Sequence, residues 1–530
     1  MIRSVRQLFI TLSTLIILAM IWLWFTVSWS WIVVIIIAPF ILLGYWDMVQ
    51  QKHALLRIYP VIGHLRFLFE SIRPEIQQYF VESNIDGRPV SREFRDLVYQ
   101  RAKGDRDTRP FGTQFEVYRN GYQWLNHSLS PQPILTEEPR VTFGGSACNQ
   151  PYSASHLNIS AMSYGSLSKN AILALNTGAR IGHFYHNTGE GGISPYHTEP
   201  GGDLVWQIGT GYFGCRTADG RFDSQLFTEK TGNPHIKMIE IKLSQGAKPG
   251  HGGILPAAKL TPEIAAIRQV PLGRDVLSPS YHAAFSTPLE LLDFIASLRE
   301  LSGGKPVGFK LCLGHKSEFL AICKAMMEKE IFPDFITVDG GEGGTGAAPI
   351  ELTNSVGTPL RDGLSFVHNA LRGCGLRDQI RLIASGKIIS AFDIIRALAL
   401  GADTVNSARA MMFALGCIQA RRCNSGDCPT GIATQDPTRT RALDVDHKAQ
   451  RVARYQQAMI HQMLELIAAA GLKSPAEIRP QHINHRVAGA TVKTYADMYP
   501  PIPENCLRED HQIPEDWLPH WSLAKSDCWG

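Results

Sequence analysis

The sequence is poor in cysteine and almost balanced in charge. It has 10 cysteines in 530 residues, too few for a scaffold held together by disulfides. Lysine and arginine number 52 and aspartate and glutamate 48, so the formal net charge is only +4. Bulk nucleic-acid binding requires a clustered cationic surface, and we therefore predict no nucleic-acid partner. The hydrophobic content of 44% excludes a disordered chain.

Several common catalytic motifs are also absent from the sequence. There is no Walker A loop, no H-E-x-x-H helix and no hydrolase nucleophile elbow. Two G-x-G-x-x-G matches occur, at Gly209–Gly214 and Gly341–Gly346. Neither has the strand–turn–helix context and the following ribose-binding acid that a dinucleotide site requires, and the first falls in Asp203–Phe227, which looks like an inserted hairpin. We therefore predict that neither binds a nicotinamide cofactor.

Charged residues are missing from Gln7 to Trp46. As one helix this run would reach about 60 Å, twice a hydrocarbon core of roughly 30 Å. Two helices, roughly Leu8–Val27 and Trp31–Tyr45, fit better, with a break near residues 28–30. One long tilted span and a cleaved signal peptide are the alternatives, although the apolar region of a signal peptide is normally only about 7–15 residues long.

Positive charge flanks this apolar run on both sides, at Arg3, Arg6, Lys52, His53 and Arg57. Positively charged flanks favour the cytoplasmic side. We therefore predict that residues 1–47 form a transmembrane helical hairpin in the inner (cytoplasmic) membrane, a two-helix anchor with the catalytic domain on the cytoplasmic side.

The rest of the chain divides by pattern into three regions. Residues 48–139 carry apolar residues at helical spacing and are predicted to be a helical connecting region. Residues 140–442 contain short apolar runs that alternate with helical stretches, and residues 443–530 are predicted to be a C-terminal helical extension with an irregular tail. The predicted strands are Leu157–Met162, His183–Asn187, Met238–Leu243, Asp275–Pro279, Val307–Cys312, Phe335–Asp339, Ile380–Ser385 and Thr404–Ala408.

Apolar strands that alternate with helices indicate an α/β fold with a parallel sheet. Eight such units match a (β/α)8 TIM barrel in number and size. The alternative is a doubly wound open sheet, which usually has fewer units. The chemistry of a barrel lies at the carboxyl ends of its strands, so these ends indicate the site.

The ends of the seventh and eighth predicted strands resemble a phosphate site. They read Ser385, Gly386 and Lys387, then Ser407, Ala408 and Arg409. Small residues leave backbone N–H groups free to hold a phosphate, and two cations add charge. Either turn alone could be an ordinary tight turn. The presence of such turns after both the seventh and the eighth strand favours a phosphate-bearing cofactor.

Lys310 lies inside an otherwise apolar strand, where a buried cation requires a partner. The pyrimidine edge of a flavin, which gains negative charge on reduction, is the partner that we predict. The ends of the first and sixth strands are the neighbouring candidates for flavin contact: Ser160, Ala161, Met162, Ser163, Asp339 and Gly340.

Three cysteines, Cys417, Cys423 and Cys428, follow the eighth strand with the spacing C-x5-C-x4-C, and Pro429 follows the third. Cysteines this close, with Cys-Pro at the end, suit an iron–sulfur cluster. A structural zinc site would normally have a fourth Cys or His nearby, and plain structural thiols are the third possibility.

Taken together, residues from about Arg109 to Arg486 resemble the FMN-binding synthase domain of glutamate synthase. The matching segments are Asn187–Gly192, Gln245–Gly250, Gly343–Ala347, and the cysteines that lead into Cys428–Gln435. The resemblance implies FMN and a 3Fe-4S cluster, with a four-iron cluster that has a non-cysteine ligand as the alternative.

The resemblance also implies the reaction, which is reduction of an imine formed from 2-oxoglutarate and ammonia. It implies that Lys242, Lys248 and Arg268 hold or polarise the oxo acid and that Glu190 lies near the ammonia. Lys248 and Glu190 would be catalytic, unless they form only a structural ion pair.

Two departures from the family pattern change what we expect. The family usually has Gln, a contact of the oxo acid, where this chain has Ile254, so the substrate could be a different 2-oxo acid. A membrane hairpin stands where the family has its glutaminase, so we expect ammonia or an amine to be supplied from outside.

The electron donor is then expected to be a ferredoxin or a partner flavoprotein, and a homo-oligomer is possible. The alternatives are an electron-transfer subunit, which passes electrons between a soluble donor and a membrane partner, and a catalytically idle scaffold.

Overall fold

The computed structural model describes residues 2–529, apart from the side chains of residues 2–4, 258 and 510. The chain forms two compact units, Met1–Arg92 and Glu93–Gly530. The boundary between them therefore falls inside the predicted connecting region of residues 48–139.

The first unit begins with two long apolar helices. α1 spans Ile2–Thr26 and α2 spans Ser30–Val49, and both are long and apolar enough to cross a membrane. The break between them lies at the predicted position. Many of their large apolar side chains are exposed, among them Trp22 at 67% and Phe25 at 82%. An exposed apolar surface of this extent is typical of a segment that contacts lipid or another protein.

These two helices pack against each other as a hairpin. The hydroxyl groups of Ser13 and Tyr45 lie 3.0 Å apart, and the ring of Phe9 meets the ring of Tyr45 edge to face. Gly44 makes room for this contact, because a Cβ atom there would lie only 2.1 Å from the Phe9 ring.

The shorter helices of the first unit are α3 (Ala54–Ile58), α4 (His64–Ile76) and η1 (Gln77–Val81), and α5 follows at Arg92–Lys103. From 104 to 139 the chain is largely irregular and has one short strand, β1 (Gln123–Leu125). The connecting region is thus helical through Lys103 and mostly irregular after it.

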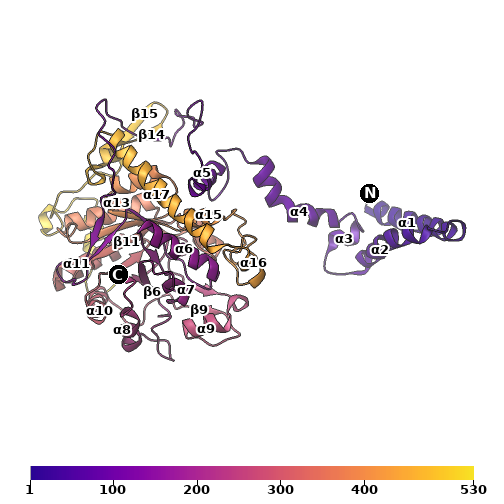
Figure 1. Cartoon of the computed structure of the whole chain (residues 1–530), viewed down its shortest axis with the longest axis horizontal. Helices are drawn as coiled ribbons and strands as arrows, with labels where there is room; N and C mark the ends of the chain where they lie inside the picture. The colour runs from indigo at the N-terminus through magenta and orange to yellow at the C-terminus, as the bar shows by residue number, and fades with distance from the viewer. Residues whose placement is uncertain (1, 530) are drawn as a thin grey trace. The chain divides into compact units, whose positions relative to one another are not determined.

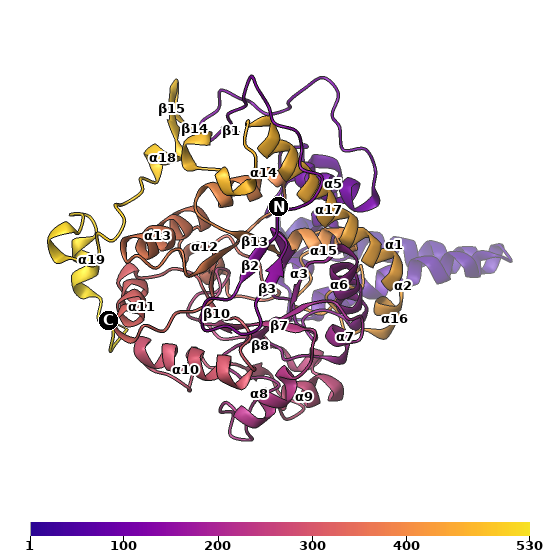
Figure 2. The same ribbon diagram turned by 60° about the vertical axis from the view of Figure 1, so that its left-hand side comes forward.

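Eight parallel strands close into a barrel in the second unit (Figures 1 and 2). In chain order they are β4 (Leu157–Ile159), β5 (His186–Asn187), β6 (Leu204–Ile208), β7 (Ile236–Lys242), β10 (Val307–Leu311), β11 (Phe335–Asp339), β12 (Arg381–Ser385) and β13 (Thr404–Ser407). The barrel closes where β13 pairs with β4, with Val405 opposite Leu157. The predicted (β/α)8 barrel is confirmed.

One strand of the barrel differs from the prediction. β6 lies within the segment that we expected to be an inserted hairpin, yet all five of its residues are buried between β5 and β7. The stretch Asp275–Pro279, expected to be the fourth strand, contributes β9 (Val276–Leu277), which pairs with β8 (Ile254–Leu255) outside the barrel. The prediction was wrong because the glycines that follow β6 obscured a short, wholly buried strand.

A small hairpin closes the amino end of the barrel. It consists of β2 (Val141–Phe143) and β3 (Tyr152–Ala154). Phe143 and Tyr152 share a buried cluster with residues at or near the beginnings of barrel strands, including Phe335. The opposite, carboxyl end therefore remains for the site.

Helices surround the barrel (Figure 2). They include α6 (Lys169–Gly182), α10 (Pro288–Leu301), α11 (Lys316–Lys329), α13 (Leu360–Gly373), α14 (Ala391–Ala399) and α15 (Arg409–Leu415). Smaller helices lie in the loops: α7 (Pro195–Thr198), α8 (Ser224–Thr231), α9 (Pro262–Arg268), α12 (Ile350–Ser355) and α16 (Pro437–Arg441). Of these, α9 brings Arg268 to the site.

The C-terminal region combines a long helix with a short sheet. α17 (Val445–Ala469) packs against α6, α14 and α15. After it, β14 (Ile483–Ala488) pairs with both β1 and β15 (Thr491–Thr494), and the short helices α18 (Tyr495–Met498) and α19 (Leu518–Leu523) follow. This region therefore contains a three-stranded sheet in the stretch that we expected to be an irregular tail.

Candidate active site

An ion pair lies at the carboxyl ends of β5 and β7. Glu190 follows β5, Lys242 is the last residue of β7, and Lys242 Nζ lies 2.7 Å from Glu190 Oε1. Gly209 and Gly253 border the carboxylate so closely that a Cβ atom on either would lie within 2.7 Å of Glu190. Glycine at these positions therefore gives the carboxylate its space.

Two further cations flank this pair. Lys248 and Arg268 are 4% and 5% exposed. Burial alone would raise the pKa of Glu190, but Lys242, Lys248 and Arg268 together lower it below its usual value. Burial lowers the pKa of Arg268 to about 10 against the opposing effect of Glu190, so the side chain stays charged at neutral pH. The pocket thus gathers three cations around one carboxylate, and the structure brings all four predicted residues together.

Two buried polar atoms near the pocket have no hydrogen-bond partner among the described residues. They are Arg268 Nε and Ser278 Oγ. A Cβ atom on Gly253 would lie 3.2 Å from Ser278 Oγ and 2.7 Å from Glu190 Oε1, so the serine borders the same space. Unsatisfied buried donors beside an excess of positive charge suit a ligand carboxylate. Ser278 was not singled out in the sequence, because its stretch was interpreted as a barrel strand.

His282 holds the backbone of Lys242 in place. His282 Nε2 lies 2.9 Å from the Lys242 carbonyl oxygen, which can only accept, so this nitrogen donates. The other ring nitrogen then accepts from the Tyr212 hydroxyl at 3.1 Å. Burial lowers the pKa of His282 to about 4, which keeps the ring neutral. Sequence reasoning missed both residues, because neither stands in a motif.

A buried carboxylate, Glu240, organises the barrel interior beneath the pocket. It accepts hydrogen bonds from Asn187 at 2.8 Å, Gln207 at 2.6 Å and Thr337 at 2.6 Å, each on a different strand. Since side chains alternate along a strand, Glu240 and Lys242 point to the same side of β7. The signal in the sequence was a charge inside an apolar strand, the signal that drew attention to Lys310.

Lys310 has a partner within the protein. Lys310 Nζ lies 3.4 Å from Asp339 Oδ2 on the neighbouring strand β11. Burial opposes the charge on Lys310, but Asp339 and Glu240 raise its pKa above the usual value. Asp339 also accepts the Gly246 N–H at 2.9 Å. A flavin is therefore not required to compensate this lysine, which corrects the argument made from the sequence.

The loops after β12 and β13 lie side by side, since Ser385 pairs with Asn406. Gly386 has a φ of 144°, where a side chain would be strained, so the backbone itself forms this part of the surface. Ala408 caps α15 without any side-chain hydrogen bond, which leaves the first-turn N–H groups of the helix available to a phosphate. Lys387 follows Gly386 directly.

Arg409 ties the loop after β11 to the end of β13. Its Nη2 atom donates to the Glu342 carbonyl oxygen at 2.6 Å. Burial lowers the pKa of Arg409, while Asp339 and Glu342 act in the opposite direction. Gly340, also in the loop after β11, donates its N–H to the Ser385 carbonyl oxygen at 2.8 Å. These contacts draw the ends of β11, β12 and β13 together.

The loop after β4 completes this end of the barrel with Ser160, Ala161, Met162 and Ser163. Ser160 N–H donates to the Ser407 carbonyl oxygen at 3.0 Å, and Met162 N–H donates to the Asn187 carbonyl oxygen at 3.1 Å. The predicted flavin-contacting residues thus belong to four neighbouring strand ends and to β10.

The three cysteines lie in the loop that follows α15. They are near enough for charge on one to affect another: burial, together with a smaller effect of Cys423 and Cys428, raises the pKa of Cys417 to about 12. Cys428 differs, because N–H groups of Ala433, Thr430 and Ile432 lower its pKa below the usual value despite burial. Such donors favour a thiolate, the form that binds metals.

No group of three His, Cys, Asp or Glu side chains within the described part of the chain converges on a site for a single metal ion. This finding includes Cys417, Cys423 and Cys428. Lys259, which sequence reasoning missed, is 6% exposed and lies at the same loop. Its Nζ donates to the Cys423 carbonyl oxygen at 2.5 Å.

A closed parallel barrel with a cation-rich pocket at its carboxyl end defines the chain as a (β/α)8-barrel enzyme. Residues 137–473 match the conserved region in glutamate synthase. The chain belongs to the glutamate synthase family and is an oxidoreductase of glutamate synthase type, and this membership supports FMN as its cofactor.

Curated relatives agree with this assignment. The chain is 37% identical over 499 residues to the glutamate synthase large subunit-like protein YerD of Bacillus subtilis, which covers 86% of this chain and 94% of that protein. It is 38% identical over 337 residues to the archaeal glutamate synthase (NADPH) of Methanocaldococcus jannaschii, covering 63% and 62% of the two chains. A solved structure of a flavocytochrome b2 mutant matches at a TM-score of 0.42 and 11% identity, too low to add to the barrel topology itself.

Proposed function

We propose that the protein is a membrane-anchored FMN and iron–sulfur oxidoreductase that reduces an imine of a 2-oxo acid, 2-oxoglutarate or an analogue, to an amino acid. External ammonia or an amine supplies the nitrogen. The observation that carries this proposal is the buried pair of Glu190 and Lys242, flanked by Lys248 and Arg268, with the unpartnered donors of Arg268 and Ser278 beside it.

The oxo acid would bind to the cations of the pocket. Arg268 and Ser278 offer donors for a carboxylate, and Lys242 polarises the keto oxygen. Ile254 begins β8 and is only partly buried. The side chain of Ile254 cannot donate a hydrogen bond, so it cannot make the contact with the oxo acid that the family's glutamine implies. The substrate could therefore be an analogue of 2-oxoglutarate.

Glu190 and Lys248 would take different proton roles. Glu190 is ionised, since the surrounding cations lower its pKa, so it attracts and orients an ammonium group. Burial lowers the pKa of Lys248, which makes its ammonium a better acid than that of an exposed lysine. Lys248 then donates a proton to the keto oxygen as it leaves as water.

FMN fits the carboxyl end of the barrel. Gly386 exposes backbone, the first turn of α15 has no side-chain cap, and Lys387 and Arg409 add positive charge where a phosphate would lie. When bound, FMN supplies hydride chemistry for the imine. The loop after β4, Ser160–Ser163, would lie along it.

A three-iron cluster would be held by Cys417, Cys423 and Cys428. The preformed N–H donors around Cys428 and the mutual influence of the three thiols support this assignment. The cluster would receive electrons from a ferredoxin or a partner flavoprotein. A four-iron cluster would be distinguished by its electron paramagnetic resonance spectrum.

The apolar helices α1 and α2 support a membrane anchor. The positive charge that flanks them favours the cytoplasmic membrane with the barrel on the cytoplasmic side. Carbonate washing should leave the full-length protein in the membrane fraction. Release by carbonate without detergent would contradict membrane integration.

The test of the function uses the full-length protein in detergent with chemically reduced ferredoxin, ammonium and 2-oxoglutarate. We expect FMN in the denatured supernatant and glutamate among the products. If FMN is present and ferredoxin is oxidised, but neither 2-oxoglutarate nor any other 2-oxo acid is aminated, the protein is instead an electron-transfer subunit.

A further inference from the structure

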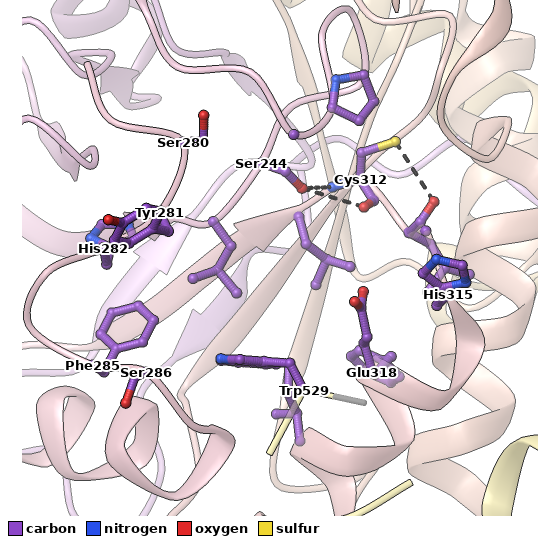
Figure 3. Close-up of a pocket in the computed structure, with 18 of the residues that line it drawn as sticks. Ser244, Ser280, Tyr281, His282, Phe285, Ser286, Cys312, His315, Glu318 and Trp529 are labelled. Carbon is purple, nitrogen blue, oxygen red and sulfur yellow. Dashed lines mark hydrogen bonds between the residues drawn. The ribbon is translucent and has the colours of Figure 1, made fainter. Parts of the chain in front are cut away.

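A large cavity opens between the ends of β7 and β10. Its volume is about 940 Å³, and its walls come from the loops after these strands, the segment 280–286, helix α11 and Trp529 (Figure 3). An ammonia molecule is about the size of water, whose share of liquid volume is about 30 Å³. The cavity is thus far larger than ammonia requires.

The cavity is lined by apolar, aromatic and hydroxyl side chains, two histidines and two carboxylates. Among the described residues that line it, Glu290 and Glu318 are the carboxylates, and none is a lysine or arginine. Phe285, Phe319 and Trp529 supply aromatic surface. In Figure 3, Glu318 lies between Trp529 and His315. A carboxylate among aromatic rings suits an organic cation.

This cavity adjoins the Glu190 pocket. A small space lined by Glu190 and Lys242 shares four of its lining residues with the large cavity: Leu243, Ser244, Gly250 and Ser280. The two neighbouring spaces differ in charge, since Lys242 lines the small one close to Lys248 and Arg268, whereas no lysine or arginine among the described residues lines the large one. This arrangement matches two substrates of opposite charge that must meet.

We infer that the cavity binds the nitrogen substrate, and that this substrate is a primary amine with an alkyl or aryl substituent rather than free ammonia. Glu318 attracts the ammonium group into the cavity and the aromatic rings contact the substituent, before the amine reaches Glu190 and the oxo acid. The inference rests on the proposed function and names its second substrate class.

The two substrates and the electron donor account for all atoms and electrons of the reaction. The alkylammonium ion and the 2-oxo acid condense to an iminium ion and one water. The iminium carbon then gains two electrons, from two reduced ferredoxins or one reduced flavoprotein, and one proton that comes from solvent. The product is an N-substituted amino acid, and the donor is oxidised by two electrons.

The test uses full-length, FMN-containing protein in detergent, with benzylamine as the probe. Calorimetric titration should show binding of benzylamine and none of benzyl alcohol, which has the same shape without the charge. Glu318→Gln should weaken binding at least tenfold. The matched control is Glu300→Gln, an exposed carboxylate on α10 outside the cavity, which should bind as the parent protein does. Trp529→Ala should also weaken binding of benzylamine. This second variant keeps the test valid if Glu318→Gln fails to fold.

Measurement of turnover distinguishes failure of this inference from failure of the proposed function. With 2-oxoglutarate, benzylamine and reduced ferredoxin, mass spectrometry should detect the N-benzyl amino acid. If ammonium is converted while benzylamine neither binds nor reacts, this inference is overturned and the proposed function stands. If neither nitrogen source reacts, the proposed function fails, and the use of an amine as substrate fails with it.

Discussion

The Glu190 pocket and the cysteine loop differ in how their surroundings shift the pKa values of their ionisable groups. In the pocket, Lys242, Lys248 and Arg268 surround one carboxylate, so positive charge is in excess. In the loop, burial raises the pKa of Cys417 and Cys423, whereas N–H donors lower that of Cys428. Lys259 lies near Cys423 and Cys428.

The two sites suit different ligands. Burying an unpaired charge is costly, so a buried cluster retains an excess of one sign where a ligand of the other sign completes it. The pocket then suits an anionic oxo acid, and the cysteine loop suits iron. Substitutions in the Glu190 pocket and in the cysteine loop test this difference.

Replacing Cys423 by serine should remove the cluster, because two cysteines cannot hold it. We expect loss of essentially all cluster iron and of ferredoxin-dependent turnover, while FMN stays bound. Elemental analysis and electron paramagnetic resonance of anaerobically purified protein measure this. Cys148→Ser, a thiol far from the loop in sequence, is the control and should keep its iron. Full iron content in Cys423→Ser would show that the loop does not bind the cluster.

Lys242→Met should lower kcat/KM for the 2-oxo acid by at least about 30-fold, since removal of one partner of a buried charge pair costs about 2–5 kcal/mol. The control is Lys237→Met on the same strand, whose lysine pairs with Asp203 at 3.6 Å near the opposite, amino end. Steady-state kinetics compare the two variants. Equal kinetics would mean that the excess positive charge of the pocket has no role in binding.

The pH dependence should show the lowered pKa of Lys248. Burial lowers this pKa and Lys242 lowers it further, against the effect of Glu190. Since the protonated form is the one that acts, kcat/KM falls as pH rises through a pKa below that of an ordinary lysine, about 10.4. Lys248→Arg should move this alkaline limb upward, because arginine stays protonated. If the alkaline fall in kcat/KM is unchanged in Lys248→Arg, it is caused by another group.

The smallest effect is expected at Lys259. Removing this cation with Lys259→Met should lower the reduction potential of the cluster, because positive charge stabilises the reduced form. A decrease of about 60 mV corresponds to tenfold in a one-electron equilibrium. Redox titration followed by electron paramagnetic resonance measures it. Lys305→Met, a buried lysine that bonds Thr231 elsewhere in the barrel, should leave the potential unchanged.

The local features of the site could be predicted from the sequence. The turn after β12, the Ala408–Arg409 step and the C-x5-C-x4-C spacing are each contained in a short segment, so their chemistry is visible without a fold. The two apolar helices were predictable for the same reason, because length and missing charge are properties of one continuous stretch.

Features that depend on contacts between segments distant in the sequence could not be predicted. Whether Leu204–Ile208 or Asp275–Pro279 completes the barrel is decided by which run becomes buried between β5 and β7. Lys310 was recognised as a buried cation, but its partner Asp339 becomes its neighbour only through the pairing of β10 with β11.

The sequence by itself determined the barrel, the two long apolar helices, the turns after β12 and β13 and the residue types of the pocket, because each depends on a local pattern or motif. Only the tertiary structure decided the balance of charge. Glu190, Lys242, Lys248 and Arg268 come from separate loops and strands, and Glu318 and Trp529 are far apart in the chain. The physical reason is that electrostatic and packing energies depend on distance in space, which is set when the barrel closes.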